Sequence, residues 1–241
     1  MLLPPSSACT FPLLSQKFLS YYGGVTVEQR ARIFAALGDP TRLAIVEDLL
    51  SSDHRPQDLG ARYGLPSNLL AHHLGVLEQA DLITRTTSSG DRRRRYVSLR
   101  HDSLSGLSLN GKDTDRPVLF VCTHNSARSQ LAAVLWEEQE LGPAASAGTE
   151  PAQRIHPGAV AAAGRSGLDL SDRHPRLLTD AAVESARVIT VCDQAHEQIE
   201  GTIPHWHWST PDPVADPTDQ SFDNTLALLR RRIATITKAT G

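Results

Sequence analysis

One stretch of this 241-residue chain, from Pro117 to Ser129, limits the folds that its second half can adopt. Residues 118–121 form a short continuous apolar run, which is typical of a strand buried within a parallel sheet. Residues 126–141 are rich in side chains that favour helices. We therefore expect a buried strand, a tight loop and the start of a helix, in that order.

The loop between this strand and this helix contains Cys122 and Arg128. Backbone N–H groups around a helix N-terminus form, together with the helix dipole, a nest that suits a tetrahedral oxyanion. The planar guanidinium of Arg128 would bind two oxygens of this oxyanion, and Cys122 would be a nucleophilic thiolate stabilised by the same donors. Ser129 would donate a hydrogen bond to the sulfur, and Asn125 would brace the loop. The expected oxyanion-binding residues are Thr123, His124, Asn125, Ser126, Ala127, Arg128 and Ser129.

The plainer interpretation of the same pair is a buried structural cysteine beside a surface arginine. Its weakness is that a strand directly precedes the pair and a helix directly follows it.

The composition of the whole chain indicates a globular protein, since 40% of the residues are hydrophobic and no apolar run is as long as a membrane span. Three scattered cysteines and the lack of a signal peptide indicate the cytoplasm, and we expect no membrane partner.

Charge is distributed unevenly along the chain. Residues 25–100 contain 11 basic and 9 acidic side chains, whereas residues 117–241 contain 10 and 15. We therefore expect a polyanion to bind the first half.

Residues 1–24 are expected to be a loose arm whose apolar side chains pack on a neighbouring domain or a dimer partner. Cys9 in this arm would be a free thiol or a metal or metalloid ligand.

The pattern of residues 25–100 predicts four helices followed by a two-stranded ribbon. An Asp39-Pro40 pair begins the second helix, and Ser67 is expected to cap the fourth, with Leu69 facing inward. The expected helices span 27–37, 40–50, 56–63 and 68–79, and the expected strands span 82–86 and 94–99. Two short helices joined by Gly64-Leu65-Pro66 and followed by a basic hairpin indicate an α+β winged helix-turn-helix.

Residues 36–45, 67–77 and 80–83 resemble the arsenic-repressor (ArsR/SmtB) family of metal-sensing regulators. The resemblance implies a DNA-binding domain, and we expect a homodimer through it. The residues that would contact DNA are Ser67, Asn68, Leu69, His72 and His73 of the recognition helix and Arg92, Arg93, Arg94 and Arg95 of the wing. A solvated charge run and a partly buried helix face are the plainer interpretations of the arginines and of the histidine pair.

One departure from this family concerns metal binding. Many members carry Cys-Val-Cys before an Asp-Leu pair, as thiolate ligands for soft metals. Here Arg55-Pro56-Gln57 precede Asp58-Leu59, so this site has no soft ligand and we expect no metal centre. Either another site senses the effector, or this regulator does not sense metalloid in that way. Residues 101–115 are small and polar, as in a linker that would leave the two domains free to move.

The motif from Cys122 to Ser129 resembles the phosphate loop of the low-molecular-weight tyrosine phosphatase superfamily, and most of all that of its arsenate reductases. The resemblance covers residues 116–241, where alternating strands and helices predict an α/β parallel sheet with Cys122 at a strand's carboxyl end. It assigns the general acid to Asp212, although Asp216-Pro217 is a competing Asp-Pro pair. Val214 stands where tyrosine phosphatases usually have an aromatic residue, which argues against phosphotyrosine.

Arsenate reduction takes two electrons, so a second thiol must attack the Cys122 sulfur. Cys192 is the candidate within this domain and aligns with the first of two resolving cysteines in thioredoxin-linked arsenate reductases. The second would fall at Ile199, which has no thiol. A small thiol such as glutathione, mycothiol or bacillithiol, or a redoxin, would complete the cycle, with no bound cofactor. Cys192 as a small core residue is the other interpretation.

These features predict an arsenic-resistance protein in which a DNA-binding regulator is joined to a thiol-dependent arsenate reductase. A phosphatase that acts on small phosphoesters is one alternative. A non-catalytic repressor that senses an oxyanion is another, and the presence of Cys122, Arg128 and Asp212 together counts against it.

Overall fold

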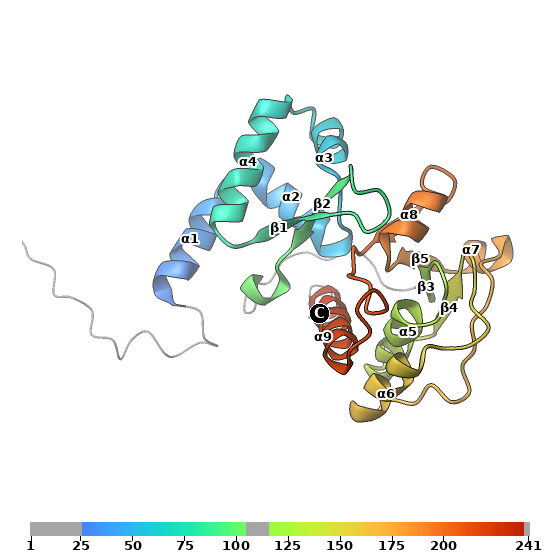
Figure 1. The fold of residues 1–241 in the computed structure, drawn as a ribbon. Helices are drawn as coiled ribbons and strands as arrows, with labels where there is room; N and C mark the ends of the chain where they lie inside the picture. Colours follow the sequence, from blue (N-terminus) through green and yellow to red (C-terminus); the bar gives the residue numbers. More distant parts are fainter. Residues whose placement is uncertain (1–25, 105–115, 239–241) are drawn as a thin grey trace, which may run out of the picture.

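The computed structural model describes residues 26–104 and 116–238 (Figure 1). The expected N-terminal arm with Cys9, and residues 105–115 of the expected linker, lie outside the described residues. The first half contains α1 (Val27–Leu37), α2 (Pro40–Ser51), α3 (Pro56–Tyr63), α4 (Ser67–Gln79), β1 (Ile83–Thr87), β2 (Arg95–Leu99) and a short 3-10 helix, η2 (His101–Leu104). Strands β1 and β2 form an antiparallel hairpin, so the four helices and the ribbon that the sequence predicts are present.

Local chemistry explains where these helices begin and end. The Asp39 side chain accepts a hydrogen bond from the backbone N–H of Arg42, and Pro40 takes the first position of α2. Gly64 ends α3 with a φ of +63°, a conformation that costs glycine little. The expected cap of α4 is wrong, because Ser67 is already helical and Pro66 precedes it without a side-chain cap. Leu69 is also 42% exposed instead of facing inward.

The second half contains β3 (Val118–Cys122), α5 (Arg128–Glu138), β4 (Ala144–Gly148), α6 (Pro157–Arg165), α7 (Asp180–Ser185), β5 (Arg187–Thr190), α8 (Asp193–Ile199), β6 (His205–His207) and α9 (Asp219–Lys238). The four strands are parallel and lie in the order β4-β3-β5-β6, which confirms the predicted sheet. Helix α9 packs against α5 and α6, and α8 packs against β3 and β5. Every helix of the described ranges is too short or too polar to serve as a membrane span.

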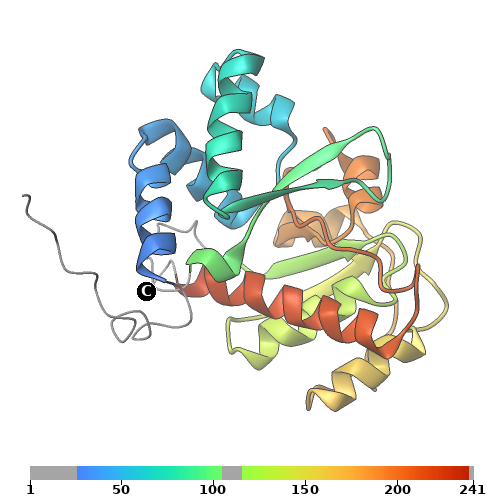
Figure 2. The same ribbon diagram turned by 60° about the vertical axis from the view of Figure 1, so that its left-hand side comes forward.

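The two halves are packed against each other through buried polar contacts. The end of α2 runs beside β6, where the backbone N–H of Asp53 donates to the carbonyl of His207 at 2.6 Å. The Asp53 carboxylate also receives both arms of the Arg232 guanidinium, at 3.1 and 2.8 Å, with both side chains buried. Figure 2 shows the β1–β2 hairpin reaching over the second half. The movement of the two halves that the linker composition suggests stays a prediction, and it would have to break these contacts.

Candidate active site

The loop after β3 is held open by the side chain of Asn125. This residue has a φ of +47°, in the left-handed region, and is fully buried. Its Oδ1 accepts from the backbone N–H of Arg176 at 2.8 Å and from Gln130 Nε2 at 3.1 Å, and its Nδ2 donates to Ser129 Oγ at 2.8 Å. Both polar atoms of the Asn125 side chain are thus engaged, which fixes the shape of the loop.

Cys122 ends β3 and lies at the bottom of this loop. Its Sγ is 3.0 Å from Ser129 Oγ and accepts a hydrogen bond from the backbone N–H of Asn125 at 3.2 Å. Gly148 of the neighbouring strand allows close approach, because a Cβ at that position would come within 2.7 Å of the Thr123 carbonyl oxygen. Gly148, Gln130 and Arg176 all contact the loop but lie outside the motif of residues 122–129. Sequence reasoning did not predict these three contacts.

Arg128 is the first residue of α5 and directly follows the loop. Only 7% of the residue is exposed. Nη2 is 3.0 Å from Asp212 Oδ2, and Nη1 donates to the carbonyl of Thr210 at 3.1 Å. Of the two competing Asp-Pro pairs, the structure brings Asp212 to the loop. Asp216 is exposed, and its carbonyl accepts from the backbone N–H of Thr218 within a local turn.

Cys192 caps the N-terminus of α8 from the end of β5. Its Sγ accepts from the backbone N–H of Ala195 at 3.3 Å and lies 3.4 Å from Thr123 Oγ1. The side chain is completely buried, and burial raises the pKa of its thiol. Thr123 follows Cys122 directly in the chain, so Cys192 contacts the first residue of the loop. Cys192 is therefore both a core residue and a neighbour of the loop.

A cluster of imidazoles lies at the boundary between the halves. His196 Nδ1 is 2.6 Å from His205 Nε2, its ring stacks on that of His207 at 4.0 Å, and His207 Nε2 is 3.2 Å from Asp193 Oδ1. Burial, with the neighbouring imidazoles, lowers the pKa of His196 to about 2. Within the described ranges no set of three or more His, Cys, Asp and Glu side chains is arranged to hold a metal ion.

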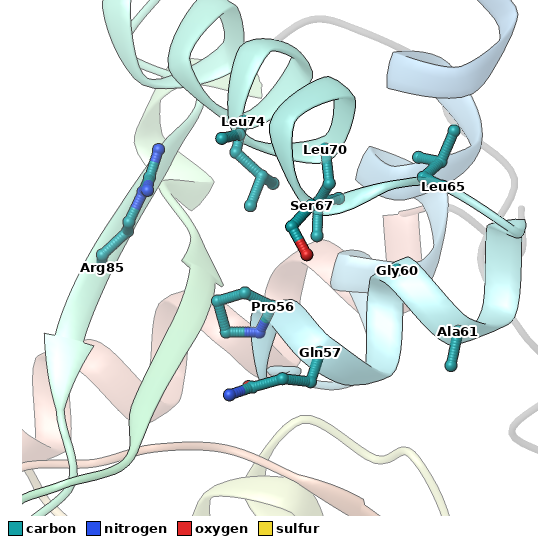
Figure 3. Close-up of a pocket in the computed structure, with 10 residues that line it drawn as sticks. Pro56, Gln57, Gly60, Ala61, Leu65, Ser67, Leu70, Leu74 and Arg85 are labelled. Carbon is teal, nitrogen blue, oxygen red and sulfur yellow. The ribbon is translucent and has the colours of Figure 1, made fainter.

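The side chains predicted to contact DNA are divided between surface and interior. Ser67, Asn68, Leu69 and His72 are exposed on α4. His73 is buried, with Nδ1 3.7 Å from Asp39 Oδ1, so it faces the helical core and not the surface. A pocket of about 510 Å³ lies between α3, α4 and β1, and Figure 3 shows the Ser67 hydroxyl beside Pro56, with Arg85 on the adjoining strand.

The hairpin arginines also differ from one another. Arg92, Arg93 and Arg95 are exposed, whereas Arg94 Nη1 is 2.5 Å from Glu200 Oε2 at the end of α8. The turn of the hairpin is bound to the same helix. Ser88 Oγ donates to Glu197 Oε1 at 2.7 Å, and the backbone N–H of Ser89 donates to Asp193 Oδ2 at 2.7 Å. This part of the predicted wing therefore contacts the second half of the chain.

Comparison with known proteins concerns the second half. Residues 117–240 match the sequence model of the family described as low molecular weight phosphotyrosine protein phosphatase. An arsenate reductase of Bacillus licheniformis is 34% identical over 113 residues, which span 44% of this chain and 80% of that protein. An arsenate reductase of Bacillus subtilis is 36% identical over 104 residues, which span 40% and 73%. A solved arsenate reductase in a phosphate-binding state is 26% identical, with a TM-score of 0.44 over 52% of this chain and 98% of that one.

Proposed function

Because this chain belongs to the low molecular weight phosphotyrosine protein phosphatase family through residues 117–240, we propose that its second half is a thiol-dependent arsenate reductase. Relatives from several Bacillus species are named arsenate reductase, and the family fits a phosphatase or a reductase activity. The observation that carries the proposal is one constellation. The Cys122 sulfur lies beside Ser129 Oγ and the Asn125 N–H, and Arg128, at the end of the same loop, is paired with Asp212.

In the first step, arsenate is bound by the loop N–H groups and by the Arg128 fork, in competition with the Asp212 carboxylate. The Cys122 thiolate forms a bond to arsenic as an As–O bond opposite the sulfur breaks. Asp212, in its protonated form, gives its proton to the departing oxygen, so that water leaves. The Ser129 hydroxyl, 3.0 Å from the sulfur, stabilises the thiolate by donating a hydrogen bond.

In the second step, another thiolate attacks the Cys122 sulfur and the S–As bond breaks. The electron pair of that bond stays on arsenic, which leaves as arsenite, and the two sulfurs become a disulfide. The attacking thiol is either Cys192, whose sulfur contacts the hydroxyl of Thr123, the residue after Cys122, or a small thiol such as glutathione or mycothiol. An external small thiol or a redoxin then reduces the disulfide, in a cytoplasm that keeps thiols reduced.

The test is arsenate reduction by the purified full-length chain with a panel of reductants. We expect arsenite to form in a thiol-dependent reaction that Cys122→Ser abolishes. Hydrolysis of a phosphoester without any thiol, and with no arsenite produced, would favour a phosphatase instead. Absence of both reactions, together with arsenate-sensitive DNA binding, would favour a repressor that only senses the oxyanion.

For the first half we propose a winged helix-turn-helix that binds DNA as a homodimer. Support comes from the order of α3, α4 and the β1–β2 hairpin, and from exposed side chains at the N-terminus of α4. Exposed Arg92, Arg93 and Arg95 add positive charge to the hairpin. Size-exclusion chromatography with light scattering, with and without a fragment of the DNA upstream of its own coding sequence, would test dimerisation and binding together.

A further inference from the structure

Asp53 belongs to the first half of the chain, yet its carboxylate is buried in the second. It follows the end of α2, and the residue is only 3% exposed. Arg232 of α9 donates to both carboxylate oxygens, at 3.1 and 2.8 Å. The backbone N–H of Ser209 donates to Oδ2 at 2.6 Å. Asp53 is thus bonded to the segment that follows β6 as well as to α9.

The segment that Asp53 holds is the one that carries the remaining groups of the active site. Thr210, next to Ser209, offers its carbonyl to Arg128 at 3.1 Å, and Asp212 contacts the same guanidinium at 3.0 Å. The Asp53 carboxylate that binds Ser209 is buried, whereas the Asp212 side chain is 35% exposed. The bond from Ser209 to Asp53 is therefore one of the fixed points of this segment, beside the Thr210 carbonyl bound to Arg128, and Asp212 lies three residues beyond Ser209.

We propose that Asp53 is a positioning residue for the general acid, supplied to the active site by the other half of the chain. It holds the segment 209–212 so that the Asp212 carboxyl stands over the loop when Cys122 attacks. Arg128 contacts this segment at Thr210 and Asp212, but its backbone is anchored at the start of buried helix α5, so we expect oxyanion binding to depend less on Asp53 than proton transfer does. The inference rests on the proposed function, since it concerns the proton that the reaction consumes.

A carboxylate is required at this position because all three groups around it are donors. An asparagine would turn its NH₂ either toward Arg232 Nη1 or toward both Arg232 Nη2 and the Ser209 N–H, so a donor would face a donor in either orientation. Asp53→Asn therefore weakens the link between α9 and the segment, while the side-chain volume changes very little. Asp53→Glu is the second variant, because it keeps the charge for Arg232 but displaces the carboxylate by one methylene from Ser209.

The first measurement is steady-state arsenate reduction by full-length wild type and Asp53→Asn at saturating thiol. We expect kcat to fall about tenfold, part of the roughly 10²–10⁴-fold that general acid catalysis contributes, with KM for arsenate within about twofold. The second measurement compares hydrolysis of phenyl phosphate and 4-nitrophenyl phosphate. Nitrophenolate departs with little need of a proton, so the loss should be several-fold larger for phenyl phosphate.

Glu200→Gln is the matched control, since it weakens contacts between the halves at Arg55 and Arg94 without touching residues 209–212. It should keep wild-type kcat and the wild-type ratio between the two esters. The inference is overturned if Asp53→Asn, or Asp53→Glu where the amide variant does not fold, keeps the wild-type kcat and ratio. It is also overturned if Glu200→Gln shows the same loss. If the wild-type protein turns over neither arsenate nor either ester, the proposed function is overturned, and this inference with it.

Discussion

The Arg128 guanidinium and the Asp212 carboxylate lie 3.0 Å apart, so the group proposed to bind the oxyanion is paired with the group proposed to protonate the leaving oxygen. An arriving anion must compete with Asp212 for the fork. The same contact leaves the carboxylate beside the bound anion once it has been displaced. Binding and proton transfer are therefore coupled through a single pair of side chains.

Asp212→Asn removes the proposed proton donor. It should lower kcat by about 100-fold or more, while affinity for inorganic phosphate should stay the same or rise, because the competing charge is gone. Steady-state kinetics with phosphate as a competitive inhibitor measures both effects. Asp216→Asn is the control and should behave as wild type; equal losses in the two variants would show that Asp212 is not the acid.

Cys192 gives a prediction about disulfide formation and its pH dependence. If Cys192 resolves the arsenic adduct, one turnover without external thiol should leave a disulfide between Cys122 and Cys192, detectable by peptide mass spectrometry and absent from Cys192→Ala. Because burial raises the pKa of Cys192, its thiolate fraction grows only toward alkaline pH. The rate of disulfide formation should therefore rise with pH. Unchanged turnover of Cys192→Ala with a small thiol would remove it from the mechanism.

The clustered imidazoles make stability depend on pH. His196 has a pKa lowered from 6.5 to about 2, so it is neutral in the folded protein and takes up a proton more readily when unfolded. The stabilisation that the neutral His196 gives to the folded protein is fully present above pH 6.5 and is lost as the pH falls toward 2. At pH 5 the free energy of unfolding should be lower by about 1–2 kcal/mol for this reason. Urea unfolding at pH 7.5 and at pH 5 measures this loss. It should shrink in His196→Asn but not in the surface control His72→Asn.

The four hairpin arginines that were predicted to contact DNA should differ in their effect on DNA binding. Replacement of Arg92, Arg93 and Arg95 by alanine should weaken binding and flatten its salt dependence, by about 0.9 in the log–log slope for each phosphate that is no longer neutralised. Arg94→Ala should change affinity little, because Glu200 already neutralises its guanidinium. Fluorescence anisotropy over a range of salt concentrations gives both quantities. An equal effect of Arg94→Ala would contradict this assignment.

Local sequence signals predicted most of the elements. The apolar run before Cys122, the Asp39-Pro40 helix start and Gly64 after α3 each act within a few residues, and each appears as expected. Helix α8 was missed because its seven residues are too few to show a helical period. The Ser67 cap was wrong because Ser67 is itself the first helical residue and Pro66 stands in the cap position.

The residues of the candidate site also divide into those that lie close together in the sequence and those that lie far apart. Cys122, Asn125 and Ser129 belong to one loop, so their spacing alone places them together. The contact of Asp212 with Arg128 joins residues 84 positions apart, and only the resemblance to a family pointed to it. Asp53 and Arg232 are 179 positions apart in halves that do not share a motif, and no local pattern predicts their pairing.

Strand β6 is the last strand of its sheet, and its outer edge is covered by residues 51–53 of the other half. The carbonyl of His207 receives the N–H of Asp53, the N–H of His207 donates to Ser52 Oγ, and the Trp208 indole donates to the carbonyl of Ser51. Excision of the second half would uncover this edge and leave its backbone groups open to strands of other molecules. We therefore expect the second half, expressed alone, to be more prone to self-association than the whole chain.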